Sequence, residues 1–117
     1  MTDRPGGAVN IANEVLADLA GYAALESYGV VGMASQTLAD GVAQLLPRQK
    51  LRKGVRVESA DAGVEVDLWV IIEHGTNLTE VSHNLANSVR HMLTETADVA
   101  VARIDVHVMG VKVRQAR

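Results

Sequence analysis

The sequence predicts an α+β domain in two layers, in which one mostly antiparallel sheet of about four strands carries two amphipathic helices on one face. Two segments repeat apolar residues at helical spacing, and several shorter segments alternate apolar and polar residues. Glycine and proline separate these segments. Because a helix stripe and a sheet face must each be buried, we expect the helices to stack on the sheet. The predicted order is α-β-β-β-α-β.

The first half of the chain supplies a helix and a short strand. One apolar stripe predicts a helix over 8–27, ended by Gly29, and VVGMA at 30–34 is typical of a short β-strand. Residues 35–53 leave the conformation open, since one or two helical turns also fit their pattern. We expect Pro47 to stop any helix there and the basic run after it to form a loop.

The second half predicts a hairpin, a helix and a last strand. VRVE at 55–58, a turn at Asp61-Ala62-Gly63 and an alternating strand at 64–73 form the hairpin. A helix is expected at about 78–96, and Gly110 shifts the phase of the final strand as a β-bulge would. In the long strand one face should be core, and the other should be mostly polar with an apolar patch; that second face comprises Glu65, Asp67, Trp69, Ile71 and Glu73.

The stretch HGTN, between that strand and the second helix, favours a structural role. A phosphate loop needs several glycines and a lysine, whereas this stretch has one glycine and no following lysine. We expect Gly75 to make the turn and Asn77 to cap the helix, with Glu80 completing a capping box.

Composition restricts the class of protein. The chain has 117 residues, 48% of them hydrophobic, and a formal net charge of -3, so we expect one globular domain at 8–113, a flexible leader at 1–7 and a basic tail at 114–117. It contains no cysteine, which excludes disulfides and thiolate chemistry. The longest apolar run, LWVII, is far short of the ~20 residues of a membrane span, so no transmembrane segment is expected.

No pattern indicates an enzyme, a metal or a cofactor. His83 and His91 are about 12 Å apart along their helix, too far to share an ion, and His74 and His107 are expected to be solvated. No serine lies in a nucleophile elbow. We expect carboxylate pairs such as Glu65 and Asp67 to be ordinary hydrated surface. The sequence therefore predicts no catalytic residue.

Two stretches could bind a partner. The basic run could contact phosphates, although a solvated loop is the favoured interpretation, and the shortage of aromatic residues argues against nucleic acid. The apolar residues on the outer sheet face could form a protein interface, or could be ordinary residues of an open sheet. The candidate anion contacts are Arg48, Lys50, Arg52, Lys53 and Arg56, and the candidate interface residues are Trp69, Ile71 and Met109.

Several motifs together resemble the bacterial alkaline shock protein family, also described as envelope stress response proteins. That family has an amphipathic helix with paired alanines followed by a Gly-Val-x-Gly-Met strand. The similarity continues at KGVRVE, at VEVDLWVIIEHGTNLTEV and at VARIDVHVMGV, and covers about residues 9–113. The residues that carry the first motif are Ile11, Val15, Leu16, Ala23, Ala24, Gly29, Val30, Gly32 and Met33.

The resemblance implies a function but no site. No catalytic residues are attributed to the family, and its members look like cytoplasmic proteins linked to envelope stress, some held at the membrane by a partner and some self-assembling. It implies a non-enzymatic scaffold or interaction domain with a protein partner, membrane-anchored or a second copy. An anion-binding module that contacts RNA or acidic lipid through residues 48–56 remains the alternative.

Overall fold

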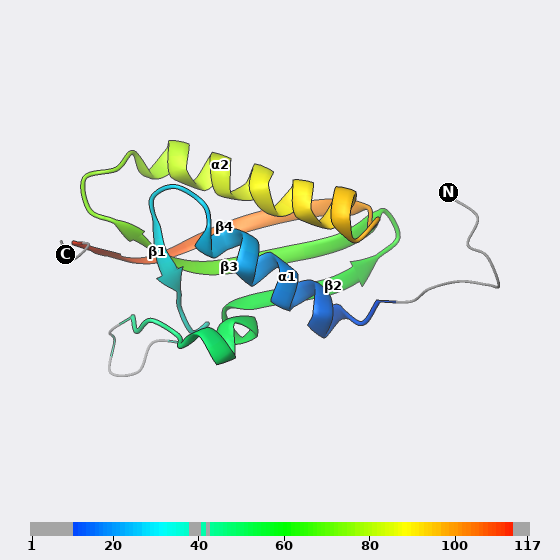
Figure 1. Ribbon diagram of the computed structural model, residues 1–117, viewed down its shortest axis with the longest axis horizontal. Coiled ribbons are helices and arrows are strands. Elements are labelled where there is room, and N and C mark those ends of the chain that lie inside the picture. Colours follow the sequence, from blue (N-terminus) through cyan, green and yellow to red (C-terminus); the bar gives the residue numbers. More distant parts are fainter. Residues whose placement is uncertain (1–10, 38–40, 42, 114–117) are drawn as a thin grey trace.

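The computed structural model describes residues 11–37, 41 and 43–113, so the predicted leader and basic tail lie outside the described residues. The elements follow the predicted order, with two short helical segments added (Figure 1). Their bounds are α1 Asn13–Leu25, β1 Val30–Met33, η1 Arg48–Gly54, β2 Val55–Ala60, β3 Gly63–Glu73, α2 Leu78–His91, η2 Met92–Thr96 and β4 Val101–Lys112.

The sheet is organised around β3. Antiparallel β2 pairs with its first half and antiparallel β1 with its second half, so that these two short strands share one edge of β3. Strand β4 runs parallel to β3 along the other edge. Helix α2 makes the crossover that a parallel connection requires (Figure 1). The predicted α+β class is confirmed, with two antiparallel pairings and one parallel pairing.

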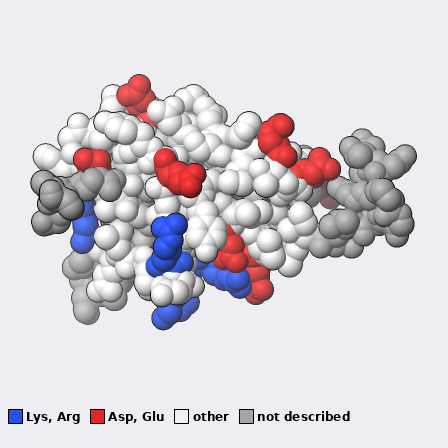
Figure 2. Space-filling view, viewed as in Figure 1, with Lys and Arg blue, Asp and Glu red and all other residues white. Residues whose placement is uncertain are grey.

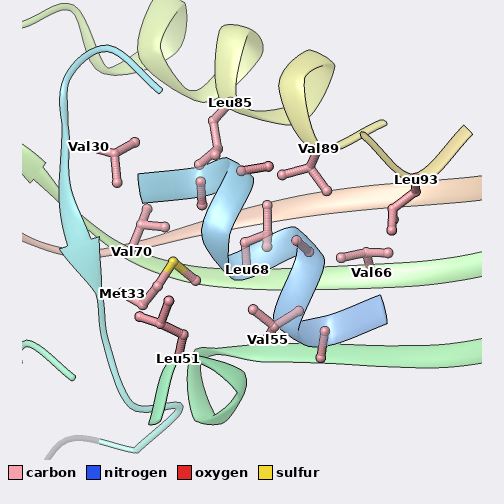
Figure 3. Packing of buried hydrophobic residues seen from close by; sticks show 14 of the residues in the cluster. Val30, Met33, Leu51, Val55, Val66, Leu68, Val70, Leu85, Val89 and Leu93 are labelled. Atoms are coloured by element: carbon pink, nitrogen blue, oxygen red, sulfur yellow. The ribbon is translucent and has the colours of Figure 1, made fainter. Parts of the chain in front are cut away.

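The core lies between the sheet and both helices (Figure 3). The alternation predicted for β3 is confirmed, because every residue of its inward row is buried. The helices contribute small and aliphatic side chains, which suits a chain without phenylalanine. Buried inward residues include Val64, Val66, Leu68, Val70 and Ile72 from β3, Leu16, Ala20 and Ala24 from α1, and Val81, Leu85 and Val89 from α2.

Two local features of the fold clarify the sequence patterns. The bulge predicted at Gly110 is confirmed, since Val108 pairs with Val70 but Gly110 pairs with Ile71, which leaves Met109 as the extra residue. The loop predicted for the basic run is wrong. Residues 48–54 form η1, two short 3₁₀ turns that meet at a kink at Lys50, and the first turn has a bond from the Lys50 N–H to the Pro47 carbonyl.

The HGTN stretch is a capped strand-to-helix junction. Gly75 has φ 92°, a backbone conformation that favours glycine, and the Asn77 side chain accepts a hydrogen bond of 2.9 Å from the Glu80 N–H. The predicted cap is therefore confirmed. The reciprocal bond of a capping box, from the Asn77 N–H to the Glu80 side chain, is not found among the described residues.

Replacing the cap should weaken α2. We expect Asn77→Ala to lower the free energy of unfolding by about 1 kcal/mol, because the Glu80 N–H loses its acceptor. Chemical denaturation monitored by circular dichroism would measure the change. Asn84→Ala is the matched control, since Asn84 is an exposed residue within the same helix and alanine favours helix there. Equal losses in both variants would contradict the capping role.

Candidate functional site

The sheet face opposite the helices is closed at one end. Ile71 lies between two glycines on neighbouring strands, Gly32 on β1 and Gly110 on β4. A Cβ at Gly32 would lie 2.7 Å from Leu45 and one at Gly110 would lie 3.4 Å from Ala43, so the side chains of Leu45 and Ala43 lie over the two glycines. They leave Ile71 fully buried. The prediction that Ile71 belongs to an exposed patch is wrong.

Trp69 is also buried on this face. Its ring stacks on His107 of β4, with centroids 4.8 Å apart, and the Arg56 guanidinium lies 5.7 Å from the ring centroid. Only 9% of the residue is exposed. The prediction placed Trp69 on the correct face, but its exposure was wrong because neighbours from β2 and β4 cover it. Met109, at the bulge, is half-buried.

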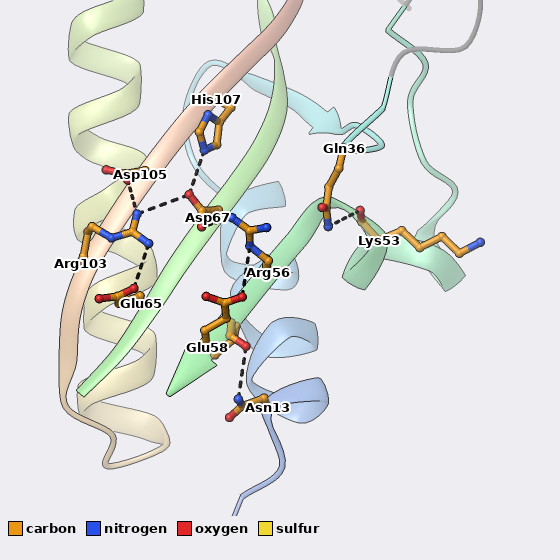
Figure 4. A network of polar contacts seen from close by, with 11 residues as sticks. Asn13, Gln36, Lys53, Arg56, Glu58, Glu65, Asp67, Arg103, Asp105 and His107 are labelled. Atoms are coloured by element: carbon orange, nitrogen blue, oxygen red, sulfur yellow. Dashed lines mark hydrogen bonds and ion pairs between the residues drawn. The ribbon is translucent and has the colours of Figure 1, made fainter. Parts of the chain in front are cut away.

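A network of charges surrounds Asp67 (Figure 4). The Asp67 carboxylate lies 2.9 Å from His107 Nε2 and accepts hydrogen bonds of 3.4 Å from Arg103 and from Arg56. Burial alone would raise the pKa of Asp67, which is 5% exposed. The bonds from His107 and Arg103, with the charges of Arg103 and Arg56, outweigh burial and hold this pKa below its ordinary value.

Arg103 joins this network to two further carboxylates. It donates to Glu65 at 3.3 Å and contacts Asp105, and its bonds to Asp67 and Glu65 raise the pKa of its guanidinium. Glu65, Asp67 and His107 were expected to be ordinary hydrated surface. That expectation is wrong for Asp67, which is buried because three strands bring its partners together. His107 is exposed as expected, although its ring also contacts Asp67 and Trp69. The charged side chains of the network hydrogen-bond to one another, and these bonds fix their positions on the outer face of the sheet.

The basic run is partly neutralised by its own neighbours. Arg52 donates two hydrogen bonds to Asp18, at 3.1 and 2.7 Å, and lies 3.4 Å from Glu14. The hydrogen bond to Asp18 and the charges of both carboxylates raise the pKa of Arg52. Figure 2 shows this gathering of Lys and Arg side chains with Asp and Glu beside them. Arg56 belongs to the Asp67 network.

The other three cations of the run lie on η1. Arg48 lies 5.7 Å from the ring centroid of Tyr22, while Lys50 and Lys53 have no ion pair with another described residue. A groove of about 290 Å³ runs between η1 and α1, and Asp18 also lines it. A carboxylate in the groove opposes an incoming anion, so this cluster is a weaker anion site than the sequence alone indicated.

The histidines of α2 do not converge. Both His83 and His91 are exposed, and His83 contacts Asn87 at 3.2 Å on the same helix. Within the described part of the chain, no group of three or more potential ligands could hold a metal ion.

Strands β2 and β4 each pair only with β3 among the described strands, and β4 offers the longer free edge. Its residues on the helix side are less covered than those of β3, because Val108 is 36% exposed and Val111 46% exposed. Val101, Ile104 and Val106 are half-buried on the same side. A long strand with one free edge and a partly exposed apolar row can accept another strand.

The sequence analysis missed the charge network around Asp67 and the stacking of Trp69 on His107, although the sequence contains a signal for each. Arg103, Asp105 and His107 alternate on one side of the last strand, as Glu65, Asp67 and Trp69 do on the earlier one. If the two strands are neighbours in parallel register, those two rows must lie side by side on one face of the sheet, as the pairing of Asp67 with Asp105 and of Trp69 with His107 shows.

Comparison with known proteins extends over nearly the whole chain. YloU of Bacillus subtilis (strain 168), named as an uncharacterized protein, is 36% identical over 108 residues, which are 92% of this chain and 90% of YloU. The uncharacterized protein Spy1614 of Streptococcus pyogenes serotype M6 is 33% identical over 108 residues, which are 92% of this chain and 89% of Spy1614.

Solved structures show the same fold at low identity. One variant of the MamM CTD superimposes with a TM-score of 0.56 at 10% identity, covering 89% of this chain and 96% of that one. A second variant gives a TM-score of 0.50 at 13% identity, covering 87% and 98%. At these identities the likeness concerns the fold alone. In the described part of the chain, no helix has the length and apolar character needed to span a bilayer.

The match to a family model agrees with the motifs. Residues 1–113 match the alkaline shock protein 23 family, which is described as having a cell envelope-related function. The resemblance inferred from the motifs is confirmed. The chain therefore belongs to the alkaline shock protein 23 family.

Proposed function

We propose that this protein is a non-enzymatic interaction domain that makes protein–protein contacts at the cytoplasmic side of the cell envelope. Its partner is a membrane-anchored protein or a further copy of the chain. The envelope-related function of the family supports the setting. The observation that carries the proposal is the free edge of β4 with its partly exposed row of apolar residues. Such an edge offers backbone hydrogen bonds and apolar area together.

The polar groups of the outer face support a non-enzymatic role. A catalytic centre needs convergent groups that remain available to a substrate. Here the Asp67 carboxylate is buried and bound by Arg56, Arg103 and His107. The Trp69 ring stacks on His107. The charged groups of this face therefore bind one another, which gives them a structural role in the sheet.

The apolar row of β4 can be tested by one charged substitution. We expect Val111→Glu to remove a membrane-anchored partner, or a second tagged copy, from a crosslinked pull-down out of cells that express the tagged full chain. A charge at this position would have to be buried with the partner. Val15→Glu is the matched control, since Val15 on α1 is 47% exposed and Val111 is 46% exposed. Recovery should survive Val15→Glu and nuclease treatment.

The same experiment tests the anion-binding alternative. That reading is favoured by Arg48, Lys50 and Lys53, which have no carboxylate partner among the described residues. It requires recovery that falls with nuclease or with salt and that persists in Val111→Glu. That result would refute the interaction domain proposed here and place the function on η1.

A further inference from the structure

Two bulges limit the regular part of the free edge. Strand β4 changes register against β3 between Val101 and Arg103, and again between Val108 and Gly110. Residues 103–108 therefore pair one for one with 65–70, and they are the longest uninterrupted stretch of β4. A bulge bends a strand and disturbs its ladder. An incoming strand can add to residues 103–108 with the least distortion.

The two faces of this stretch differ in chemistry. Ile104, Val106 and Val108 lie on the helix side, whereas Arg103, Asp105 and His107 lie on the outer side. A partner strand must place apolar side chains beside the first row and polar ones beside the second, because each strand alternates faces. The stretch itself has this pattern. A second copy of β4 therefore meets the requirement when it runs antiparallel about a two-fold axis.

Antiparallel β4 strands can pair in several registers, each set by the residue through which the two-fold axis passes. Charge and the positions of the bulges favour one of them. An axis at Asp105 would place the two Asp105 carboxylates directly opposite each other, which is unfavourable. An axis at Ile104 would bring the pairing into the bulge at Ala102. An axis at Val106 places Asp105 opposite the partner's His107 and Ile104 opposite the partner's Val108. All five positions from 104 to 108 are then paired between the bulges.

We propose that two copies of this chain join edge to edge through antiparallel β4 strands, with the two-fold axis at Val106. This inference rests on the proposed function and names its partner. The joined sheet carries the helices of both copies on one face, because the pairing keeps the two rows separate. It covers the apolar row of β4 that α2 leaves half-exposed. It also pairs the backbone groups of the free edge.

An introduced cysteine tests the axis directly, since the chain has no cysteine of its own. We expect Val106→Cys to give a disulfide-linked dimer under mild oxidation, because residues opposite each other have Cβ atoms about 4.5–5.5 Å apart. Ile104→Cys is the matched control. The two Ile104 positions would be offset by four residues along each strand, roughly 13 Å, which is beyond the reach of a disulfide.

A charge substitution tests the pairing without cysteine chemistry. We expect Asp105→Lys to raise the dissociation constant of the dimer at least about tenfold in sedimentation equilibrium of the full chain, since lysine would face the partner's His107 and stand beside Arg103. Glu95→Lys makes the same charge change at an exposed position of η2 and should leave the constant unchanged. Circular dichroism of each variant would establish that it is folded.

Each outcome separates this inference from the proposed function. A monomer at every concentration, or equal crosslinking of Val106→Cys and Ile104→Cys, would overturn the two-fold pairing. If Val111→Glu still abolishes capture of a membrane-anchored partner, the interaction domain stands with a different occupant at its edge. If the dimer forms as described but the wild-type chain captures no envelope protein from cells, the pairing stands and the envelope setting of the proposed function fails.

Discussion

Trp69→Ala should lower the free energy of unfolding by about 3–5 kcal/mol, the range found when a buried aromatic side chain is removed. The indole is 9% exposed and lies between Arg56 of β2 and His107 of β4. Removing it would leave a cavity on the outer face and would remove the ring on which His107, a partner of Asp67, stacks. Denaturant unfolding followed by far-ultraviolet circular dichroism would measure this loss.

Tyr28→Ala provides the control for that change. Tyr28 is 76% exposed, and we expect its replacement to alter stability by less than about 0.5 kcal/mol. If Trp69→Ala were as stable as Tyr28→Ala, the indole would have to be free at the surface. The outer face would then offer the apolar patch that the sequence indicated.

Asp67→Asn should lower the free energy of unfolding at neutral pH by roughly 2 kcal/mol, the magnitude typical of lost charge-assisted hydrogen bonds. The asparagine keeps an acceptor for one donor but cannot balance Arg56, Arg103 and His107 as the carboxylate does. Thermal or denaturant unfolding at pH 7 would give the difference from the wild type.

The pH dependence of this difference has a definite sign. The folded protein holds the pKa of Asp67 below its ordinary value, which is about 3.9 in an unfolded chain. The ionised carboxylate therefore contributes its full stability above about pH 4, and this contribution is lost as the pH falls through the lowered pKa. We expect the wild type and Asp67→Asn to converge in stability in acid.

Asp61→Asn is the reference for the pH series. Asp61 is exposed in the turn between β2 and β3, and no ion pair with another described residue involves it. Its replacement should produce little change at any pH. A difference between the wild type and Asp67→Asn that stayed constant down to strongly acidic pH would show that the carboxylate charge is not what stabilises the network.

Local sequence patterns predicted the features that depend on local physics. The inward row of β3, the cap at Asn77 and the bulge at Gly110 each follow from a few neighbouring residues. Alternation sets the face on which a residue lies, and a side-chain acceptor before a helix satisfies a free N–H. These features do not depend on which strands become neighbours.

The state of the outer face depends on neighbours that are distant in the sequence. The sequence pattern places Trp69 at the surface, because it does not show that β4 lies beside β3. That pairing brings His107 against the ring. The sequence pattern places Ile71 at the surface, because it does not show that the side chains of Ala43 and Leu45 lie over the glycines on either side of it. The basic run likewise reads as one patch. Its Arg52 and Arg56 are neutralised by α1 and β3, which the sequence does not place beside them.

The parallel pairing of β3 with β4 has a consequence for synthesis on the ribosome. Strand β4 is the last described element to leave the exit tunnel, and it reaches its place only after α2 has crossed over the sheet. Until then the apolar β3 has one edge without its native neighbour, although β1 and β2 can already occupy the other. On a polysome, a nascent chain at this stage offers adjacent nascent chains the most apolar strand of the domain. The delay before β4 docks is therefore the interval in which wrong pairing between chains is most favourable.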